Sequence, residues 1–171
     1  MSGFNADLFR TETPGSGHTL VWENISFEDV SGSQGGVRIF NINGGDTSFR
    51  GPATGQCAFR NNNIALQLIL VTNGGTLNIQ ECDFEGNTIN NEDMIDVVDS
   101  PSVTIKNNNI LQNDVAFEVL DFVDSGVVKL TNVDIIDNIA ADNLIEVNES
   151  QLTMKKVKII GNQAPNNILD S

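Results

Sequence analysis

Acidic residues recur at nearly constant spacing in the second half of the chain. Asp96, Asp121, Glu146 and Asp170 follow one another at intervals of 25, 25 and 24 residues. Several carboxylates that converge can bind calcium, which prefers oxygen ligands. Two carboxyl groups about 5 to 9.5 Å apart can instead hydrolyse a glycosidic bond. Either chemistry requires a fold that brings these distant residues side by side.

Other residue types that carry out chemistry are sparse. The single histidine, His18, follows a Gly-Ser segment and has no Ser or Cys at a spacing typical of a nucleophile and base. One His and two Cys cannot supply the four ligands of a zinc site. The sequence has no glycine-rich phosphate-binding motif between a strand and a helix. We therefore expect no catalytic residues and no cofactor, with a calcium ion as the alternative.

Composition limits the partners of the protein. The chain of 171 residues has 39% hydrophobic residues, enough for one globular domain with a buried core. It carries 23 acidic against 9 basic residues, a net charge of -14, which opposes binding to nucleic acid or to an anionic membrane. The longest apolar run, residues 68–71, is far shorter than the roughly 20 residues of a membrane span. We expect no nucleic acid partner and no membrane insertion.

The elements that would position the acidic residues come from an internal repeat. Four segments align at intervals of 24 to 26 residues: TLNIQECDFEGN (76–87), SVTIKNNNILQN (102–113), VVKLTNVDIIDN (127–138) and QLTMKKVKIIGN (151–162). Their apolar positions form columns such as Leu77, Val103, Val128 and Leu152. Upstream, TLVWENISF (19–27) and CAFRNN (57–62) have the same internal spacing. The 32 residues between Phe27 and Phe59 predict an insertion within residues 44–55.

Each repeat contains two short alternating segments, an Asn-rich turn and a third short strand, within residues 68–71, 95–97, 120–122 and 144–147. Alternation with a period of two favours strands, and no segment has the pattern of a helix. Three short strands in each repeat of about 25 residues are typical of a parallel β-helix, whose coils stack about 4.8 Å apart. We predict an all-β, right-handed parallel β-helix of about six coils of 24–26 residues with one longer coil.

The predicted solenoid covers residues 19–171 and follows an N-terminal segment or cap, residues 1–18. Its last repeat stops within the third strand, with no capping element after it. An open coil leaves backbone groups and apolar side chains uncovered. We therefore expect either that the chain is part of a longer solenoid or that its last coil stacks end to end on another copy.

An asparagine closes the second segment of each later repeat. The series is Asn62, Asn87, Asn113, Asn138 and Asn162. Stacked amides at a tight inward corner can hydrogen-bond along the axis, each to the next. We predict a structural asparagine ladder.

These residues resemble a known family. Phe59-Arg-Asn-Asn62 and Phe84-Glu-Gly-Asn87 are similar to the FxxN motif of the polymorphic outer-membrane protein repeats of bacterial surface adhesins. Gly35-Gly36-Val37 resembles the start of that family's GGAI motif, and later repeats keep the frame with Ile in place of Phe. The resemblance implies a β-helix of the broad pectin-lyase-like kind and a role in adhesion at a surface.

The two cysteines, Cys57 and Cys82, occupy one column of adjacent repeats. Stacking would place their Cα atoms about 5 Å apart, within the range of a disulfide. Side chains stacked in parallel point the same way, however, and a disulfide needs a specific torsion. We expect two reduced, buried thiols that pack as small hydrophobic groups, with a disulfide as the alternative.

The acidic residues of the third strands would form one exposed column, with Asp93 and Glu118 in a second column beside it. We interpret this face as a solvated acidic surface. The alternative is a calcium site at Asp96, Asp121 and Glu146, because stacked like charges raise one another's pKa unless a cation lies among them.

Uniform coils and short turns leave no walls for a substrate cleft. We therefore expect a non-catalytic structural or adhesive segment of an extracellular or cell-surface assembly, which binds a protein or carbohydrate partner through a flat acidic face. One alternative is a carbohydrate-active enzyme, a polysaccharide lyase or glycosidase, that uses the stacked carboxylates. The other is a phage-fibre or filament subunit. No signal peptide is visible in the opening MSGFNADLFR.

Overall fold

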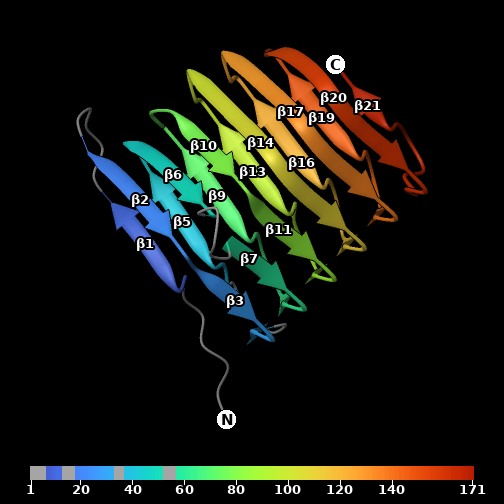
Figure 1. The fold of residues 1–171 in the computed structure, drawn as a ribbon, viewed down its shortest axis with the longest axis horizontal. Coiled ribbons are helices and arrows are strands. Elements are labelled where there is room, and N and C mark those ends of the chain that lie inside the picture. Colours follow the sequence, from blue (N-terminus) through green and yellow to red (C-terminus); the bar gives the residue numbers. More distant parts are fainter. Residues whose placement is uncertain (1–6, 13–17, 33–36, 52–56) are drawn as a thin grey trace.

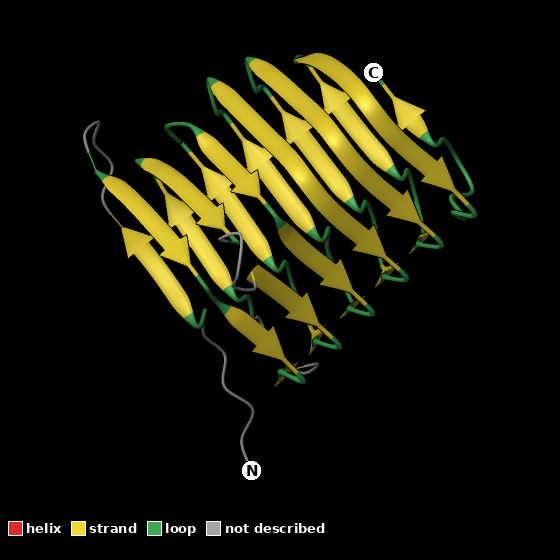
Figure 2. Cartoon of the chain, in the orientation of Figure 1, coloured by secondary structure: helices red, strands yellow, loops and turns green. Residues whose placement is uncertain are grey.

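The structure, a computed structural model, describes residues 7–12, 18–32, 37–51 and 57–171. Gly35 and Gly36 of the GGAI-like motif and residues 52–55 of the predicted insertion lie outside the described residues. The chain winds into a β-solenoid of about six coils stacked along the long axis of the molecule (Figure 1). The strand pairs of the described residues are all parallel, and the described part of the chain has no helix (Figure 2). The predicted all-β parallel fold is confirmed.

The strands of the coils form three sheets. Sheet 1 consists of β1 (Phe9–Glu12), β5 (Phe40–Asn43), β9 (Ile69–Thr72), β13 (Ile95–Val98), β16 (Leu120–Val123), β19 (Ile145–Asn148) and β21 (Leu169–Asp170). Sheet 2 consists of β2 (Thr19–Glu23), β3 (Ser26–Glu28), β6 (Asp46–Arg50), β7 (Cys57–Arg60), β10 (Leu77–Gln80), β11 (Cys82–Glu85), β14 (Ser102–Leu111), β17 (Val127–Ile136) and β20 (Gln151–Ile160). Sheet 3 consists of β4 (Ser31–Gly32), β8 (Asn63–Ile64), β12 (Thr88–Ile89), β15 (Asp114–Val115) and β18 (Ile139–Ala140).

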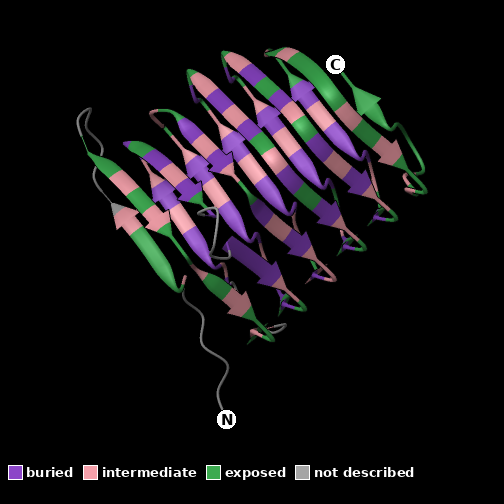
Figure 3. Cartoon of the chain, viewed as in Figure 1, coloured by how far each residue is buried: buried purple, intermediate pink, exposed green. Residues whose placement is uncertain are grey.

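The core lies inside the coils and follows the predicted columns. Leu77 pairs with Val103, Val103 with Val128, and Val128 with Leu152. Because side chains alternate along a strand, each of these positions points inward while its neighbours face outward. The buried residues form continuous stripes through the middle coils, whereas the last coil is largely exposed (Figure 3).

Aromatic rings pack inside the first three coils. Phe59 and Phe84 stack with ring centroids 4.8 Å apart, and Phe9 lies 5.0 Å from Phe40 and 5.1 Å from Trp22 by the same measure. Phe9 belongs to β1, which pairs with β5. Strand pairing therefore begins before residue 19, within the segment that we treated as a cap.

The segment predicted as an insertion contains a regular strand, β6. Its Thr47 pairs with Leu77 and its Phe49 with Ile79, and both side chains are buried. The polar Thr47 in an apolar column concealed this strand in the sequence. Most of the extra residues lie between Arg50 at the end of β6 and Cys57 at the start of β7, and the connection from β4 to β5 is also longer than that from β8 to β9.

The asparagine ladder is confirmed. The backbone N–H and Nδ2 of Asn87 both donate to Oδ1 of Asn113, at 3.0 and 2.8 Å. The same pair of hydrogen bonds joins Asn62 to Asn87, Asn113 to Asn138 and Asn138 to Asn162. Each Nδ2 also donates to a backbone carbonyl of the preceding coil, so the ladder ties successive coils together.

The prediction of reduced thiols is wrong, because Cys57 and Cys82 form a disulfide. The two residues pair directly across β7 and β11, with Cα atoms 4.5 Å apart. This separation lies near the lower end of the range that a disulfide spans. Direct register brings the two sulfurs together even though both side chains point into the same core.

Candidate functional site

The acidic column predicted from the sequence lies on the outer face of sheet 1. Asp96 pairs with Asp121, Asp121 with Glu146, and Glu146 with Asp170. The adjacent positions Ile95 and Val97 are buried, so the acidic side chains point away from the core. The first three are half-buried rather than exposed, which corrects the prediction of a fully solvated column.

A second polar column begins three residues before the first. It contains Gln67, Asp93, Glu118 and Asn143, each at the entrance to its strand of sheet 1. The backbone N–H of Glu118 donates to Oδ1 of Asp93 at 2.9 Å, which joins two successive coils. Asp93, Glu118 and Asn143 are only 8%, 6% and 4% exposed.

Sequence reasoning recognised Asp93 and Glu118 in this column but missed Gln67 and Asn143. Each residue of the column lies three positions before an outward-facing residue of sheet 1, and this constant spacing was the signal that could have identified all four.

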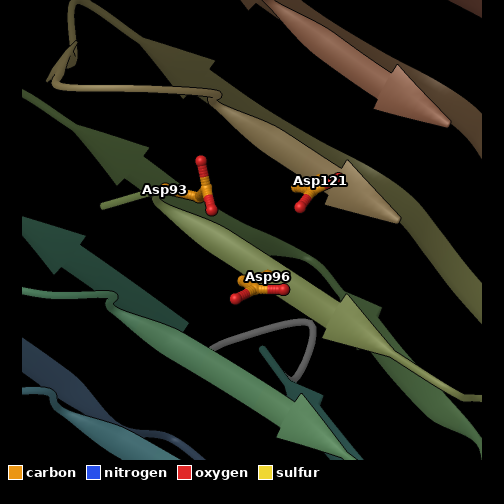
Figure 4. Close-up of side chains that lie close together, drawn as sticks. All are labelled: Asp93, Asp96 and Asp121. Atoms are coloured by element: carbon orange, nitrogen blue, oxygen red, sulfur yellow. The ribbon is translucent and has the colours of Figure 1, made fainter. Parts of the chain in front are cut away.

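Side chains from both columns converge between β13 and β16. One carboxylate oxygen from each of Asp93, Asp96 and Asp121 lies within 4.8 Å of the other two. Figure 4 shows Asp96 and Asp121 on the two strands and Asp93 before the start of β13. Glu146, which we predicted as a calcium ligand with Asp96 and Asp121, is not one of these three and accepts a 3.0 Å hydrogen bond from Nδ2 of Asn143. We call Asp93, Asp96 and Asp121 the aspartate cluster.

Burial and mutual repulsion disfavour the charged forms of these carboxyl groups. Desolvation, followed by the charges of Asp93 and Asp96, raises the pKa of Asp121 to about 7. Desolvation and the charge of Asp93 also raise the pKa of Asp96 to about 6. The pKa of Glu118 is raised by desolvation and by its hydrogen bond to Asp93. Without a cation, Asp121 is therefore partly protonated near pH 7, and Asp96 to a smaller extent.

Several oxygens at this site are buried without a hydrogen-bond partner. They are Oδ1 of Asp96, Oδ1 of Asp121 and Oδ1 of Asn143. Burying a polar atom without a partner is costly, and native structures rarely leave one unpaired. Among the described residues, Arg38, Arg50 and Arg60 form ion pairs with acidic residues outside the cluster. None of these three arginines therefore forms an ion pair with the cluster.

The remaining predicted chemical groups lie elsewhere. His18 precedes β2, where its backbone carbonyl accepts a hydrogen bond from Asp46. Lys155, Lys156 and Lys158 lie on β20 of sheet 2. The described residues include no helix long and apolar enough to cross a membrane.

Comparison with known proteins does not assign the site. No protein-family model matches this chain, and no curated protein sequence matches it either. The geometry of the described residues therefore carries the functional argument.

Proposed function

We propose that this chain is a non-catalytic binding segment of an extracellular or cell-surface assembly, and that it contacts its partner through the outer face of sheet 1. The observation that carries the proposal is the acidic column of Asp96, Asp121, Glu146 and Asp170, which crosses four successive coils on one face. A regular column of this kind offers equivalent contacts at repeated intervals and suits an extended partner. The net charge of -14 favours a partner with basic groups.

Two further features support this function. The disulfide between Cys57 and Cys82 fits an oxidising compartment, such as the outside of a cell. The FxxN-like segments ending at Asn62 and Asn87 each place their Asn in the ladder. This arrangement is consistent with the right-handed, pectin-lyase-like solenoid and the adhesin-type role that the resemblance implies.

A binding experiment with a matched control tests the proposal. The protein is immobilised and exposed to a basic peptide, a basic protein and a panel of neutral and acidic polysaccharides. The variant Asp96→Asn/Asp121→Asn should lose binding to the partner it recognises. The control Asp114→Asn/Asp134→Asn removes the same charge from sheets 3 and 2 and should retain it. Equal loss in both variants would show that overall charge, rather than this face, is responsible.

A polysaccharide-active enzyme is the second candidate. The observation that favours it is the pKa of Asp121, raised to about 7, which suits a general acid near neutral pH. Such an enzyme would cleave a polysaccharide from the same panel, and Asp121→Asn would abolish cleavage. Release of new chain ends by the wild-type protein, and not by the variant, would replace the binding proposal with this one.

A fibre subunit, the third class, would form stable trimers in solution.

A further inference from the structure

We propose that Asp93, Asp96 and Asp121 form a binding site for one divalent cation of the calcium class. The site lies between β13 and β16, and its ligand oxygens come from two successive coils (Figure 4). Oxygen-only donors select hard cations over zinc or copper.

The spacing of the oxygens fits calcium. Calcium lies about 2.3 to 2.6 Å from each oxygen ligand, so two ligands of one ion can be at most about 4.6 to 5.2 Å apart. The three cluster oxygens lie within 4.8 Å of one another, so each pair satisfies the upper limit for two ligands of one calcium ion. Magnesium, at about 2.1 Å from its ligands, limits the separation to about 4.2 Å and demands a stricter octahedral geometry.

The unpaired oxygens are an independent indication of a ligand. Oδ2 of Asp96 accepts a 3.0 Å hydrogen bond from Nε2 of Gln67, while Oδ1 of the same carboxylate is buried and has no partner. Oδ1 of Asp121 is in the same situation. Two carboxylates of one cluster therefore each keep a buried oxygen that a cation would satisfy.

Asn143, in the next coil, also has a buried oxygen without a partner. The residue is only 4% exposed, and its Oδ1 has no hydrogen-bond partner. Its Nδ2 lies 3.0 Å from Glu146 and 3.5 Å from Glu118, so the amide group stands between carboxylates of the two columns. Calcium takes six to eight oxygens. Glu146 pairs with Asp121 in register, and the backbone N–H of Glu118 donates to Asp93, so both residues adjoin the cluster. Added carboxylate or water ligands there would complete the coordination.

The charges around the cluster favour the binding of a cation. The coulombic effects on Asp96 come from Asp93 and Glu92, which oppose its ionisation, and from Arg38, which has the smallest effect of the three. Arg38 also pairs with Asp7 and donates to Gln67. Negatively charged groups therefore outweigh positively charged groups around Asp96.

The proposed cation site shares its face with the proposed function but does not depend on it. A bound ion could order the face for a partner, and the site would exist without any partner. Ion binding is measured on the isolated protein, so failure of this proposal and failure of the partner proposal give different results.

Titration calorimetry of the chelator-treated protein with calcium chloride tests the site. We expect saturable binding with a stoichiometry of one. Asp121→Asn should weaken calcium affinity about tenfold or more, because it replaces a charged ligand. Asp134→Asn, which removes the same charge from β17 of sheet 2, should leave the affinity unchanged. Asp93→Asn provides a second ligand variant if Asp121→Asn does not fold.

Thermal unfolding provides a second measurement. Millimolar calcium should raise Tm of the wild-type protein, while sodium chloride at equal ionic strength should not. Asp121→Asn should lose most of this rise. An unchanged wild-type Tm together with no saturable heat would overturn the proposal. So would equal calcium affinity in the wild-type, Asp121→Asn and Asp93→Asn proteins, because the ion would then bind elsewhere.

Discussion

Asn113 shows how much one side chain contributes to the stacking of coils. Its Nδ2 donates to the carbonyl of Phe84 in the preceding coil and to Oδ1 of Asn138 in the next. Its Oδ1 accepts two hydrogen bonds from Asn87. All of these groups are buried, so removing the amide leaves several donors and acceptors without partners.

We expect Asn113→Ala to lower the free energy of unfolding by about 3 kcal/mol or more. Chemical denaturation measures this change. The control is Asn109→Ala in the preceding strand, β14, where an exposed amide makes one hydrogen bond to Asp83 and the loss should be about 0.5 kcal/mol or less. Similar losses in the two variants would mean that the ladder contributes no more than a surface amide.

Asp121 makes the stability of the ion-free protein depend on pH. Its pKa is raised from 3.8 to about 7, so the folded protein binds this proton more tightly than the unfolded chain does. The resulting contribution to stability is complete below about pH 4 and is lost as the pH rises through about 7. Asp96, with its pKa raised to about 6, acts in the same direction.

In the presence of chelator, the free energy of unfolding should therefore fall between pH 4 and pH 8. Asp121→Asn removes the contribution of this residue, so the variant should show a smaller fall and should be more stable than the wild-type protein at pH 8. Denaturant unfolding at each pH measures both curves. Parallel curves for the two proteins would show that Asp121 is not the group responsible.

At the scale of elements, the corners of the coil account for much of the Asn and Asp content. Positive backbone φ angles recur at equivalent corners: 57° at Glu81, 56° at Asn107, 56° at Asn132 and 54° at Lys156. Asn and Asp adopt this left-handed conformation more readily than other residues with a side chain. Among the described residues, nine of the thirteen non-glycine residues with positive φ are Asn or Asp, so these residue types often serve to turn the chain.

The disulfide stabilises the junction of β7 and β11. It closes a loop of 25 residues, and both cysteines are fully buried. By the chain-entropy relation, a loop of this length stabilises the folded protein by about 3 kcal/mol. The double variant Cys57→Ala/Cys82→Ala should lower the free energy of unfolding by at least this amount.

Denaturant unfolding of the double variant and of the wild-type protein, with and without reductant, measures the effect. Reductant should lower the stability of the wild-type protein and leave that of the double variant unchanged. A wild-type protein with the same stability in both conditions would indicate that the cross-link does not contribute.

At the scale of the whole molecule, columns of paired residues run from the first coil of the solenoid to the last. Strand pairing through the coils places Trp22 and Met154 in one column, and Glu23 and Lys155 in the next. A second copy stacked end to end would continue both columns, with Met154 on Trp22 and Lys155 beside Glu23. Met154, Ile160 and Leu169 are 41%, 51% and 40% exposed on the last coil, which gives this contact an apolar component.

We therefore expect the 171-residue chain, expressed by itself, to self-associate through β20. Sedimentation across a wide range of concentrations should show a series of oligomers, because head-to-tail contacts do not close. Met154→Lys should reduce this association by adding a charge to the contact. A monomer at all concentrations, with rapid hydrogen exchange along β20, would mean that the lysines protect the edge from pairing.

The sequence by itself determined the repeat, the order of the strands and the register between coils. A period of two specifies which side chains face inward, and a slip of one residue would turn the apolar columns outward. The repeat at 24 to 26 residues then places Leu77 on Val103 and Asn87 on Asn113, as the structure has them. Where Thr47 interrupts an apolar column, the sequence signal failed and a strand was mistaken for an insertion.

Only the tertiary structure decided what the stacked side chains do. Register placed Cys57 on Cys82 but did not determine whether their sulfurs would bond, since this depends on side-chain torsions and on the separation of the two strands. The alignment also made Asp96, Asp121 and Glu146 neighbours. The structure adds Asp93 to the first two and buries oxygens of Asp96 and Asp121. Burial and convergence arise from the packing of one coil against the next, which the linear repeat does not specify.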